Sequence, residues 1–148
     1  MKTSGVDHIT LIVKDVQKSK EFYTRVCGMK VIVEEKEVVG LTDGTFSLWI
    51  ALSREGKSPP FNPELTGLNH WAFKVTSMQE LQNIEKELKQ LDIPMEDNGI
   101  TDDGYGGTGI FTQDPDGMKV EFHALKKLSV GKYFWDKTNN AQPKVLKT

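Results

Sequence analysis

The stretches VDHITLIVKDVQKSKEFY (residues 6–23) and LNHWAFKVTSMQELQNIE (residues 68–85) decide the fold of this chain. Aligned without a gap, they place His8 over His70. In both stretches a short alternating run is followed by a helix-like pattern, which indicates two copies of one structural unit. The sequence therefore predicts a fold built from an internal duplication.

The start of each copy has the two-residue period of a strand. Ile9, Leu11 and Val13 form one apolar face, and His8 lies on the other, mixed face. His70 takes the same position in the second copy. We expect a helix to pack on the apolar face and to leave both histidines on the open side.

Helix boundary signals follow both strands. Asp15 is a candidate N-cap and Gly28 a candidate stop for the first helix. In the second helix Ser77 and Glu80 have the spacing of a capping box, and Pro94 follows the end of the apolar stripe. Each copy is thus predicted to run from strand to helix.

Alternating runs return after each helix, with turn sequences at residues 43–44 and 114–117 before the last strand of each half. Each half therefore reads strand, helix, strand, strand, strand. The predicted fold class is α+β, with two tandem βαβββ modules that form a curved mixed sheet around a shared cavity. Module one covers about residues 4–54, and module two covers about residues 66–126.

The last strand of module two carries polar residues on its open face. Glu121 and His123 alternate there with apolar Phe122. If both sheets curl the same way, His8, His70 and Glu121 project into one cavity. Two imidazoles and a carboxylate suit one divalent ion (Zn, Mn, Fe, Ni or Co) and leave coordination positions open for water or substrate.

Bulk properties exclude other classes of partner. The 148 residues have a net charge of -2 and a pI near 5.9, so we expect no nucleic-acid partner. The only cysteine, Cys27, rules out an internal disulfide, and no apolar run suits a signal peptide or a membrane span. The predicted location is cytoplasmic, and the predicted partner is a small-molecule substrate.

The segments DHITLIVKD (7–15), SKEFY (19–23), NHWAFKV (69–75) and DPDGMKVEFH (114–123) resemble the vicinal oxygen chelate superfamily. That superfamily includes glyoxalase I, fosfomycin-resistance enzymes, extradiol dioxygenases and bleomycin-binding proteins. The resemblance implies a single glyoxalase-like domain over residues 1–126, with 127–148 as a C-terminal tail.

The resemblance assigns His8, His70 and Glu121 as the metal ligands. It implies a metal-dependent lyase- or isomerase-like enzyme whose metal binds two vicinal oxygens of a small substrate. Thr10 and Trp49 are then candidate substrate-binding residues.

Two further residues are candidates for proton transfer. Tyr105 lies in the glycine-rich connection 104–109, where it could cover a ligand, and His123 shares the face of Glu121. We expect both to act as catalytic residues.

Two members of the superfamily fit the sequence less well than the general scheme. Glyoxalase I-like enzymes add a glutamate ligand on the fourth strand, which here reads FSLWIAL (46–52) without a carboxylate. Fosfomycin-resistance enzymes need basic and hydroxyl groups around a phosphonate, but no lysine or arginine lies between Glu96 and Phe111. Acidic side chains in that stretch would repel an anion.

Two alternatives stay open. One is an Fe(II) enzyme of the extradiol dioxygenase type, which would recruit His123 or Tyr105 for proton transfer. The other is a drug-binding module without metal chemistry, similar to bleomycin-resistance proteins. Metal content distinguishes the binding module from both enzymes.

The tail carries the apolar group YFW at residues 133–135, which is costly to leave in water. We expect this group to dock over the cavity or on a partner subunit. Superfamily members often form dimers, so we expect a homodimer.

Overall fold

The computed structural model describes residues 3–54, 59–104 and 106–125. Predictions about Tyr105 and about the YFW group of the tail lie outside these residues. The elements of module one are β1 (His8–Val13), α1 (Val16–Arg25), β2 (Lys30–Glu34), β3 (Val38–Thr42) and β4 (Ser47–Leu52). Those of module two are β5 (Trp71–Val75), α2 (Met78–Gln90), η1 (Glu96–Asn98), β6 (Thr101–Asp102), β7 (Gly107–Gln113) and β8 (Lys119–Leu125).

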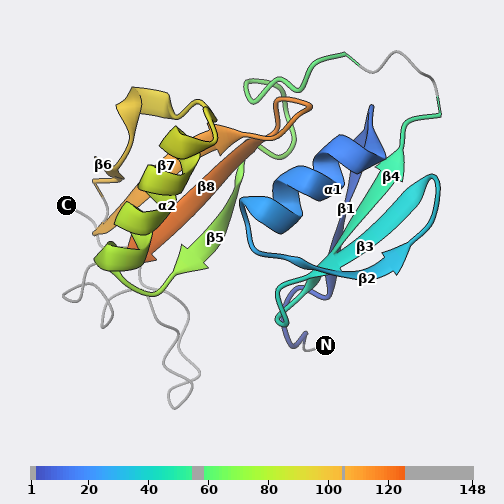
Figure 1. The fold of residues 1–148 in the computed structure, drawn as a ribbon, viewed down its shortest axis with the longest axis horizontal. Coiled ribbons are helices and arrows are strands. Elements are labelled where there is room, and N and C mark those ends of the chain that lie inside the picture. Colours follow the sequence, from blue (N-terminus) through green and yellow to red (C-terminus); the bar gives the residue numbers. More distant parts are fainter. Residues whose placement is uncertain (1–2, 55–58, 105, 126–148) are drawn as a thin grey trace.

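The strands form two four-stranded mixed sheets with the same topology. Their strand orders are β1-β4-β3-β2 and β5-β8-β7-β6. In each sheet the first strand pairs in parallel with the last, and the other pairs are antiparallel. Figure 1 shows the two modules side by side, with α1 and α2 each lying over its own sheet. The predicted α+β fold with two βαβββ modules is confirmed.

Both helices begin at the predicted caps. The Asp15 carboxylate accepts hydrogen bonds from the backbone N–H groups of Gln17 and Lys18, at 3.0 and 3.1 Å. The Ser77 hydroxyl accepts from the Glu80 N–H at 3.2 Å. Such caps satisfy N–H groups that have no partner within the helix.

Module two departs from the symmetric pattern in its second strand. β6 has only two residues, and positive φ angles at Asp97 and Asn98 interrupt the chain just before it. The glycine-rich connection expected at residues 104–109 also ends early, because β7 begins at Gly107 and pairs with β8 over that length. The connection is therefore shorter than its composition predicts.

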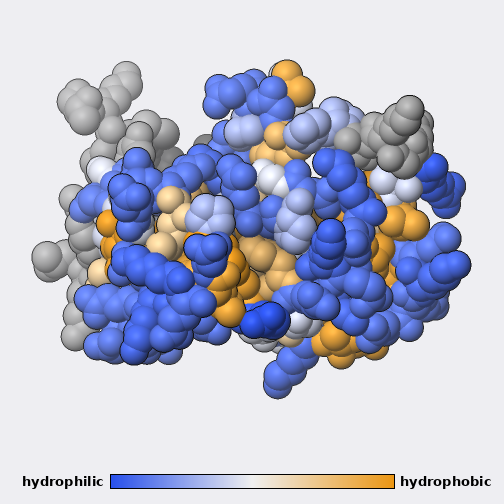
Figure 2. All heavy atoms as spheres, turned by 45° about the horizontal axis from the view of Figure 1, so that its top comes forward, coloured by the Kyte–Doolittle hydropathy of each residue, from blue (hydrophilic) through white to orange (hydrophobic). Residues whose placement is uncertain are grey.

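The core lies between each sheet and its helix. On β1, Leu11 and Val13 are buried, whereas His8 and Thr10 are exposed, as their alternation predicts. β5 alternates in the same way, and α2 contributes Leu81 to the core. Figure 2 shows hydrophobic atoms at the surface between two mostly hydrophilic halves of the molecule.

Buried contacts join the two modules. The Tyr23 hydroxyl on α1 donates to the Asp114 carboxylate, in the turn before β8, at 2.8 Å. The Tyr23 ring also packs on Trp71 of β5, with 5.5 Å between centroids. Near the surface, Lys14 meets Asp116 of the same turn, through its backbone N–H at 3.2 Å and its ammonium group at 3.6 Å. Module one therefore holds the last turn of module two.

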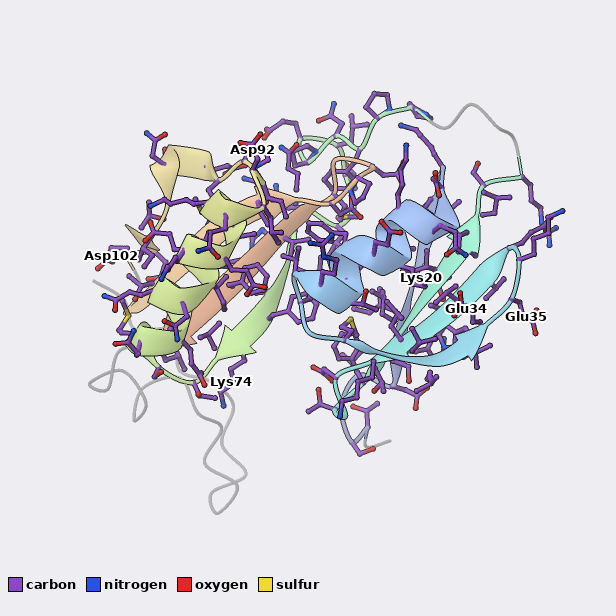
Figure 3. The ribbon with its side chains drawn as sticks, in the orientation of Figure 1. Lys20, Glu34, Glu35, Lys74, Asp92 and Asp102 are labelled. Carbon is purple, nitrogen blue, oxygen red and sulfur yellow. The ribbon has the colours of Figure 1, made fainter. Side chains whose placement is uncertain are left out.

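An ion pair at the surface joins α1 to β2 within module one. Lys20 of α1 and Glu34 of β2, both labelled in Figure 3, lie 2.7 Å apart between Nζ and Oε1. An exposed pair of this kind contributes about 0–1 kcal/mol. Among the described residues, no helix is long and apolar enough to cross a membrane.

Candidate metal centre

Each sheet has a face turned away from its helix, which we call the open face. Register places Thr10 beside Trp49 in module one and Ala72 beside Glu121 in module two. The open face of module one includes His8, Thr10, Ile12, Ile32 and Trp49, and that of module two includes His70, Ala72, Glu121 and His123. The predicted candidate residues within the described chain thus lie on the open faces.

His70 and Glu121 form the central pair of this region. The His70 Nε2 atom and the Glu121 Oε2 atom are 3.3 Å apart. Glu121 is buried, with 6% of its surface exposed, whereas His70 is partly exposed. A buried carboxylate is costly unless it is paired or binds a cation, so this pair is a candidate ligand set.

The second ring nitrogen of His70, Nδ1, has its own partner. The Nδ1 atom lies 2.7 Å from Oδ1 of Asn69, which accepts the Nδ1 proton in the neutral ring. The Nε2 atom faces a carboxylate oxygen of Glu121 at 3.3 Å, where it can donate a proton in the metal-free protein or offer its lone pair to a bound cation. Two electron-pair donors that face each other fit a divalent cation bound by both.

A glycine on the neighbouring strand makes room for the Glu121 carboxylate. A Cβ atom added at Gly109 of β7 would lie 2.5 Å from Glu121 Oε1, well inside van der Waals contact. The absence of a side chain at Gly109 therefore lets the carboxylate occupy its position beside His70. The donor types and this clearance both fit a metal ion held by His70 and Glu121.

His8 lies apart from this pair. Its Nδ1 atom is 2.8 Å from the Asp7 carboxylate, and its side chain is 55% exposed. Within residues 3–54, 59–104 and 106–125, no three or more His, Cys, Asp or Glu side chains are grouped so that they could hold one metal ion. One chain thus brings together two of the three predicted ligands.

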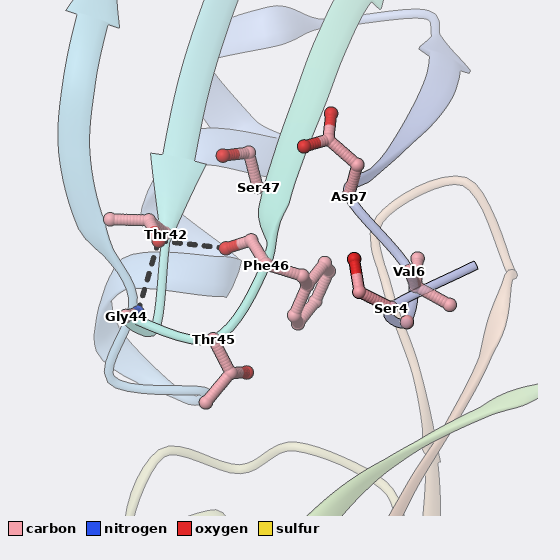
Figure 4. A pocket seen from close by; sticks show the side chains of 9 residues that line it. Ser4, Val6, Asp7, Thr42, Gly44, Thr45, Phe46 and Ser47 are labelled. Carbon is pink, nitrogen blue, oxygen red and sulfur yellow. Dashed lines mark hydrogen bonds between the residues drawn. The ribbon is translucent and has the colours of Figure 1, made fainter. Parts of the chain in front are cut away.

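A polar hollow of about 380 Å³ lies next to Asp7. Its lining combines the Phe46 ring with polar residues, namely Ser4, Asp7, Thr42, Thr45 and Ser47 (Figure 4). Ser47 pairs with His8 across β1 and β4. The exposed histidine therefore lies at the edge of a hollow that suits polar groups.

His123 is paired with an acidic residue that the sequence did not indicate. Its Nε2 atom lies 2.9 Å from Oδ2 of Asp103, and both side chains are about one-quarter exposed. A Cβ at Gly107 would lie 2.1 Å from the His123 ring, so this glycine makes room for the pair. The arrangement is compatible with the predicted catalytic role of His123, which stays a prediction.

The two predicted substrate-binding residues lie together in module one. Thr10 and Trp49 are neighbours in the register of β1 and β4, and Trp49 is only partly buried. A Cβ at Gly40 of β3 would lie 3.2 Å from the Trp49 ring, so this glycine lets the indole lie close to the backbone of β3. Their substrate role stays a prediction.

Lys119, at the start of β8, is already paired with an acidic residue. Lys119 of β8 lies 2.8 Å from the Glu96 carboxylate and 5.0 Å from the centroid of the Phe111 ring. Phe111 in turn meets the edge of the His70 ring. Within the part of the chain that the structure describes, Lys119 is therefore not free to pair with an anionic substrate.

Sequence reasoning missed three polar neighbours of the histidines. They are Asp7, Asn69 and Asp103. A signal for the first two was available, because an Asp or Asn side chain precedes each histidine in the aligned copies. Asp103 had no such signal, since its contact with His123 depends on how the chain enters β7.

Comparison with known proteins gives one family. Residues 5–122 match the family described as Glyoxalase/Bleomycin resistance protein/Dioxygenase superfamily. The chain is 32% identical over 123 residues to the metallothiol transferase FosB of Lysinibacillus sphaericus, covering 83% of this chain and 84% of that protein. It is 33% identical over 132 residues to the fosfomycin resistance protein FosX of Listeria monocytogenes, covering 82% and 90%.

Solved structures share the fold. The crystal structure of lactoylglutathione lyase from Agrobacterium tumefaciens has a TM-score of 0.67 and 21% identity, covering 84% of this chain and 96% of that one. Identity at this level supports the architecture alone.

Proposed function

The chain belongs to the Glyoxalase/Bleomycin resistance protein/Dioxygenase superfamily, and we propose that it is a metal-dependent enzyme acting on a small substrate with vicinal oxygens. His70 and Glu121 hold one divalent ion in this proposal. The reaction is of the lyase, isomerase or thiol transferase type.

One observation carries the proposal. The Nε2 atom of His70 faces the buried Glu121 carboxylate at 3.3 Å, and Gly109 leaves room for that carboxylate. The Asn69 oxygen faces Nδ1 at 2.7 Å, so a ring with its proton on Nδ1 can offer the Nε2 lone pair to a cation. The pair is therefore arranged to donate two lone pairs to a cation.

A bound divalent ion supplies Lewis acidity, which stabilises negative charge that develops on a substrate oxygen. The protein residues around it have separate tasks. His70 and Glu121 keep the ion on the open face of module two. His123, held by Asp103 at 2.9 Å, is placed two residues further along β8 as a proton carrier. Thr10 and Trp49 bind the substrate.

We also propose that a second copy of the chain supplies the third ligand. His8 lies on the open face of module one, where Ile12 is 61% and Ile32 is 50% exposed. Large apolar side chains on a sheet face indicate a surface that another protein covers. In a homodimer the open face of module one covers that of module two in the partner, so His8 completes the site.

The substrate class follows from the charges and from the named relatives. FosB is named a metallothiol transferase, which favours a reaction that uses a thiol compound. FosX is named a fosfomycin resistance protein, so a phosphonate drug belongs in any test. The pairing of Lys119 with Glu96 and the acidic stretch from Glu96 to Asp103 favour a substrate less anionic than a phosphonate.

The first experiment measures metal content and then activity. Protein purified without chelators or nickel resin is expected to carry about one divalent ion per chain, and Glu121→Gln to lose it. The metal-loaded protein is then assayed with α-oxoaldehyde thiol adducts, with epoxides plus thiols including fosfomycin, and with catechols. Full metal content in Glu121→Gln would refute the site, and turnover of catechols alone would favour the dioxygenase alternative.

The second experiment tests the shared site by mixing variants. His8→Ala and Glu121→Gln each lack metal as pure homodimers. In a mixed dimer, the Glu121→Gln chain contributes an intact His8, and the His8→Ala chain contributes an intact His70 and Glu121. Mixing should therefore restore metal binding and activity in one site of each mixed dimer. No recovery on mixing, while wild-type chains remain active, would place the site within one chain.

A further inference from the structure

We propose that Asn69 is a positioning residue that sets the tautomer of His70, through a hydrogen bond that links the histidine to the connection between the modules. The inference rests on the proposed function, because the selected tautomer presents Nε2 to a metal ion. Asn69 itself lies on the far side of the ring and contacts neither the Glu121 carboxylate nor a ligand in this scheme.

The orientation of the Asn69 amide follows from its two contacts. The Nδ2 group donates to the backbone carbonyl of Pro63 at 3.0 Å, and Oδ1 lies 2.7 Å from Nδ1 of His70. A carbonyl oxygen can only accept, so the amide nitrogen must face Pro63. The amide oxygen is thereby fixed toward His70, where it can only accept, so this hydrogen bond needs the ring proton on Nδ1.

The Pro63 carbonyl is itself held by local structure. The Asn62 side chain accepts from the Glu64 N–H at 2.9 Å, and the Asn62 carbonyl accepts from the Leu65 N–H at 3.3 Å. This turn presents the Pro63 carbonyl to Asn69. The connection between the modules thus takes part in orienting a predicted ligand.

The effect on the histidine is specific to its chemistry. A free neutral imidazole side chain prefers the proton on Nε2, which would block that nitrogen as a ligand, and the Glu121 carboxylate can accept that proton when no metal is bound. The hydrogen bond from Nδ1–H to Asn69 favours the other tautomer. Partners of this kind orient metal-binding histidines, and their loss typically weakens metal affinity by about 10- to 100-fold.

In module one, His8 and Asp7 form the equivalent contact, in which a side-chain oxygen accepts the Nδ1 proton of the strand histidine, but this contact is less constrained. Asp7 accepts from Nδ1 of His8 at 2.8 Å, but its side chain is 97% exposed. Asn69, in contrast, is tied to Pro63 on its other side. We therefore assign the stronger positioning role to Asn69.

The direct test reads the tautomer in the full-length, metal-free protein. Nitrogen-15 NMR distinguishes protonated from unprotonated ring nitrogens, and a His70→Ala variant assigns the signals among the three histidines. At a pH where the ring is neutral, wild type is expected to have a larger Nδ1–H population than Asn69→Ala, in which Nε2–H donates to Glu121. Asn69→Asp, which keeps an acceptor oxygen, is expected to retain the wild-type population of Nδ1–H.

A second measurement follows zinc affinity by competition with a coloured chelator. Asn69→Ala should bind about 10- to 100-fold more weakly than wild type, and Asn69→Asp should stay close to wild type. Asn83→Ala removes an exposed asparagine from α2 and serves as the matched control.

The outcomes separate this inference from the proposed function. An unchanged tautomer population or an unchanged zinc affinity in Asn69→Ala would overturn the inference. Loss of zinc in His70→Ala would still support the metal site in that case. If Asn69→Asp behaves like Asn69→Ala, the acceptor oxygen is not the cause and the inference is also overturned.

Discussion

The two modules share one backbone plan but carry different side chains at equivalent positions. Register places Thr10 beside Trp49 in module one and Ala72 beside Glu121 in module two. An aromatic ring therefore occupies the site where module two has a buried carboxylate. The duplicated scaffold therefore supplies two similar open faces that carry different groups at this equivalent position.

The turns before the last strand differ in the same way. The Asp43 carboxylate in module one accepts from the backbone N–H groups of its own turn and is exposed. Asp114 in module two is buried, and it accepts the hydroxyl proton of Tyr23 from module one. One turn is self-contained, whereas the other joins the modules.

The largest expected effect is on metal binding by the two histidines. His70→Ala should lower zinc affinity on the order of 100-fold or more. Free energies of zinc binding in structural sites total about 10–16 kcal/mol and are shared by roughly four ligands, so the loss of one ligand removes a large part of the affinity. His8→Ala should also lower zinc affinity, because the proposed dimer uses His8. Competition with a chelator measures both.

The stability of the metal-free variants distinguishes the modules further. His8 is exposed, so His8→Ala should change the free energy of unfolding by less than about 0.5 kcal/mol. His70→Ala leaves the buried Glu121 carboxylate without its partner and should destabilise more. Denaturant unfolding measures the free energy of unfolding of both variants. Equal losses would contradict the view that His70 has a buried partner and His8 does not.

The next effect concerns two glycines, Gly40 and Gly109, which lie against Trp49 and Glu121 respectively. In Gly109→Ala the new methyl group would lie 2.5 Å from Glu121 Oε1 and must displace the carboxylate. Zinc affinity should fall by about 10- to 100-fold, as for other disturbances of ligand orientation. Gly40→Ala, the control, meets the Trp49 ring at 3.2 Å and should leave zinc affinity unchanged. Wild-type affinity in Gly109→Ala would show that the clearance has no role in the site.

The sequence was sufficient to predict the framework of both modules. Duplicated alternation located the strands, and Asp15 and Ser77 marked the helix starts, because these signals act over neighbouring residues. Alternation also predicted the face on which His70 meets Glu121.

Other features could not be read from the sequence. The contacts of His123 with Asp103 and of Tyr23 with Asp114 join residues far apart in the chain, so they depend on register and rotamers. The placement of His8 relative to the pair depends on how the modules, or two chains, are arranged. Periodicity carries no information on that arrangement.

The buried tie between the modules gives a smaller effect on stability. Tyr23→Phe removes the hydroxyl that donates to Asp114 and leaves a buried carboxylate oxygen unsatisfied. The free energy of unfolding should fall by about 1–3 kcal/mol. Thr45→Val, which removes an exposed hydroxyl bonded to Asp43 in the other turn, should have a smaller effect. Equal losses in a denaturant titration would mean that the two turns contribute alike.

The smallest expected effect is a difference in pH dependence between the two aspartates. Burial raises the pKa of Asp114, and the hydrogen bond from Tyr23 only partly offsets this. Burial also acts to raise the pKa of Asp43, but the hydrogen bonds from Thr45 and Phe46 outweigh it and lower the pKa below its usual value. The two carboxylates therefore shift stability in opposite directions.

The sign follows from which state binds protons more tightly. The contribution of Asp114 to the free energy of unfolding is fully present below the pKa of the group in the unfolded state, about 3.9. It is lost as pH rises through the higher pKa of the folded state. That of Asp43 is present above about 3.9 and is lost as pH falls through the lower folded value. Measured from about pH 3 to pH 7, the stability of wild type relative to Asp114→Asn should decrease with pH, and that relative to Asp43→Asn should increase. If both stability differences changed with pH in the same direction, the proposed contrast would be wrong. That contrast is between a buried turn that contacts the other module and an exposed turn whose aspartate bonds only within its own turn.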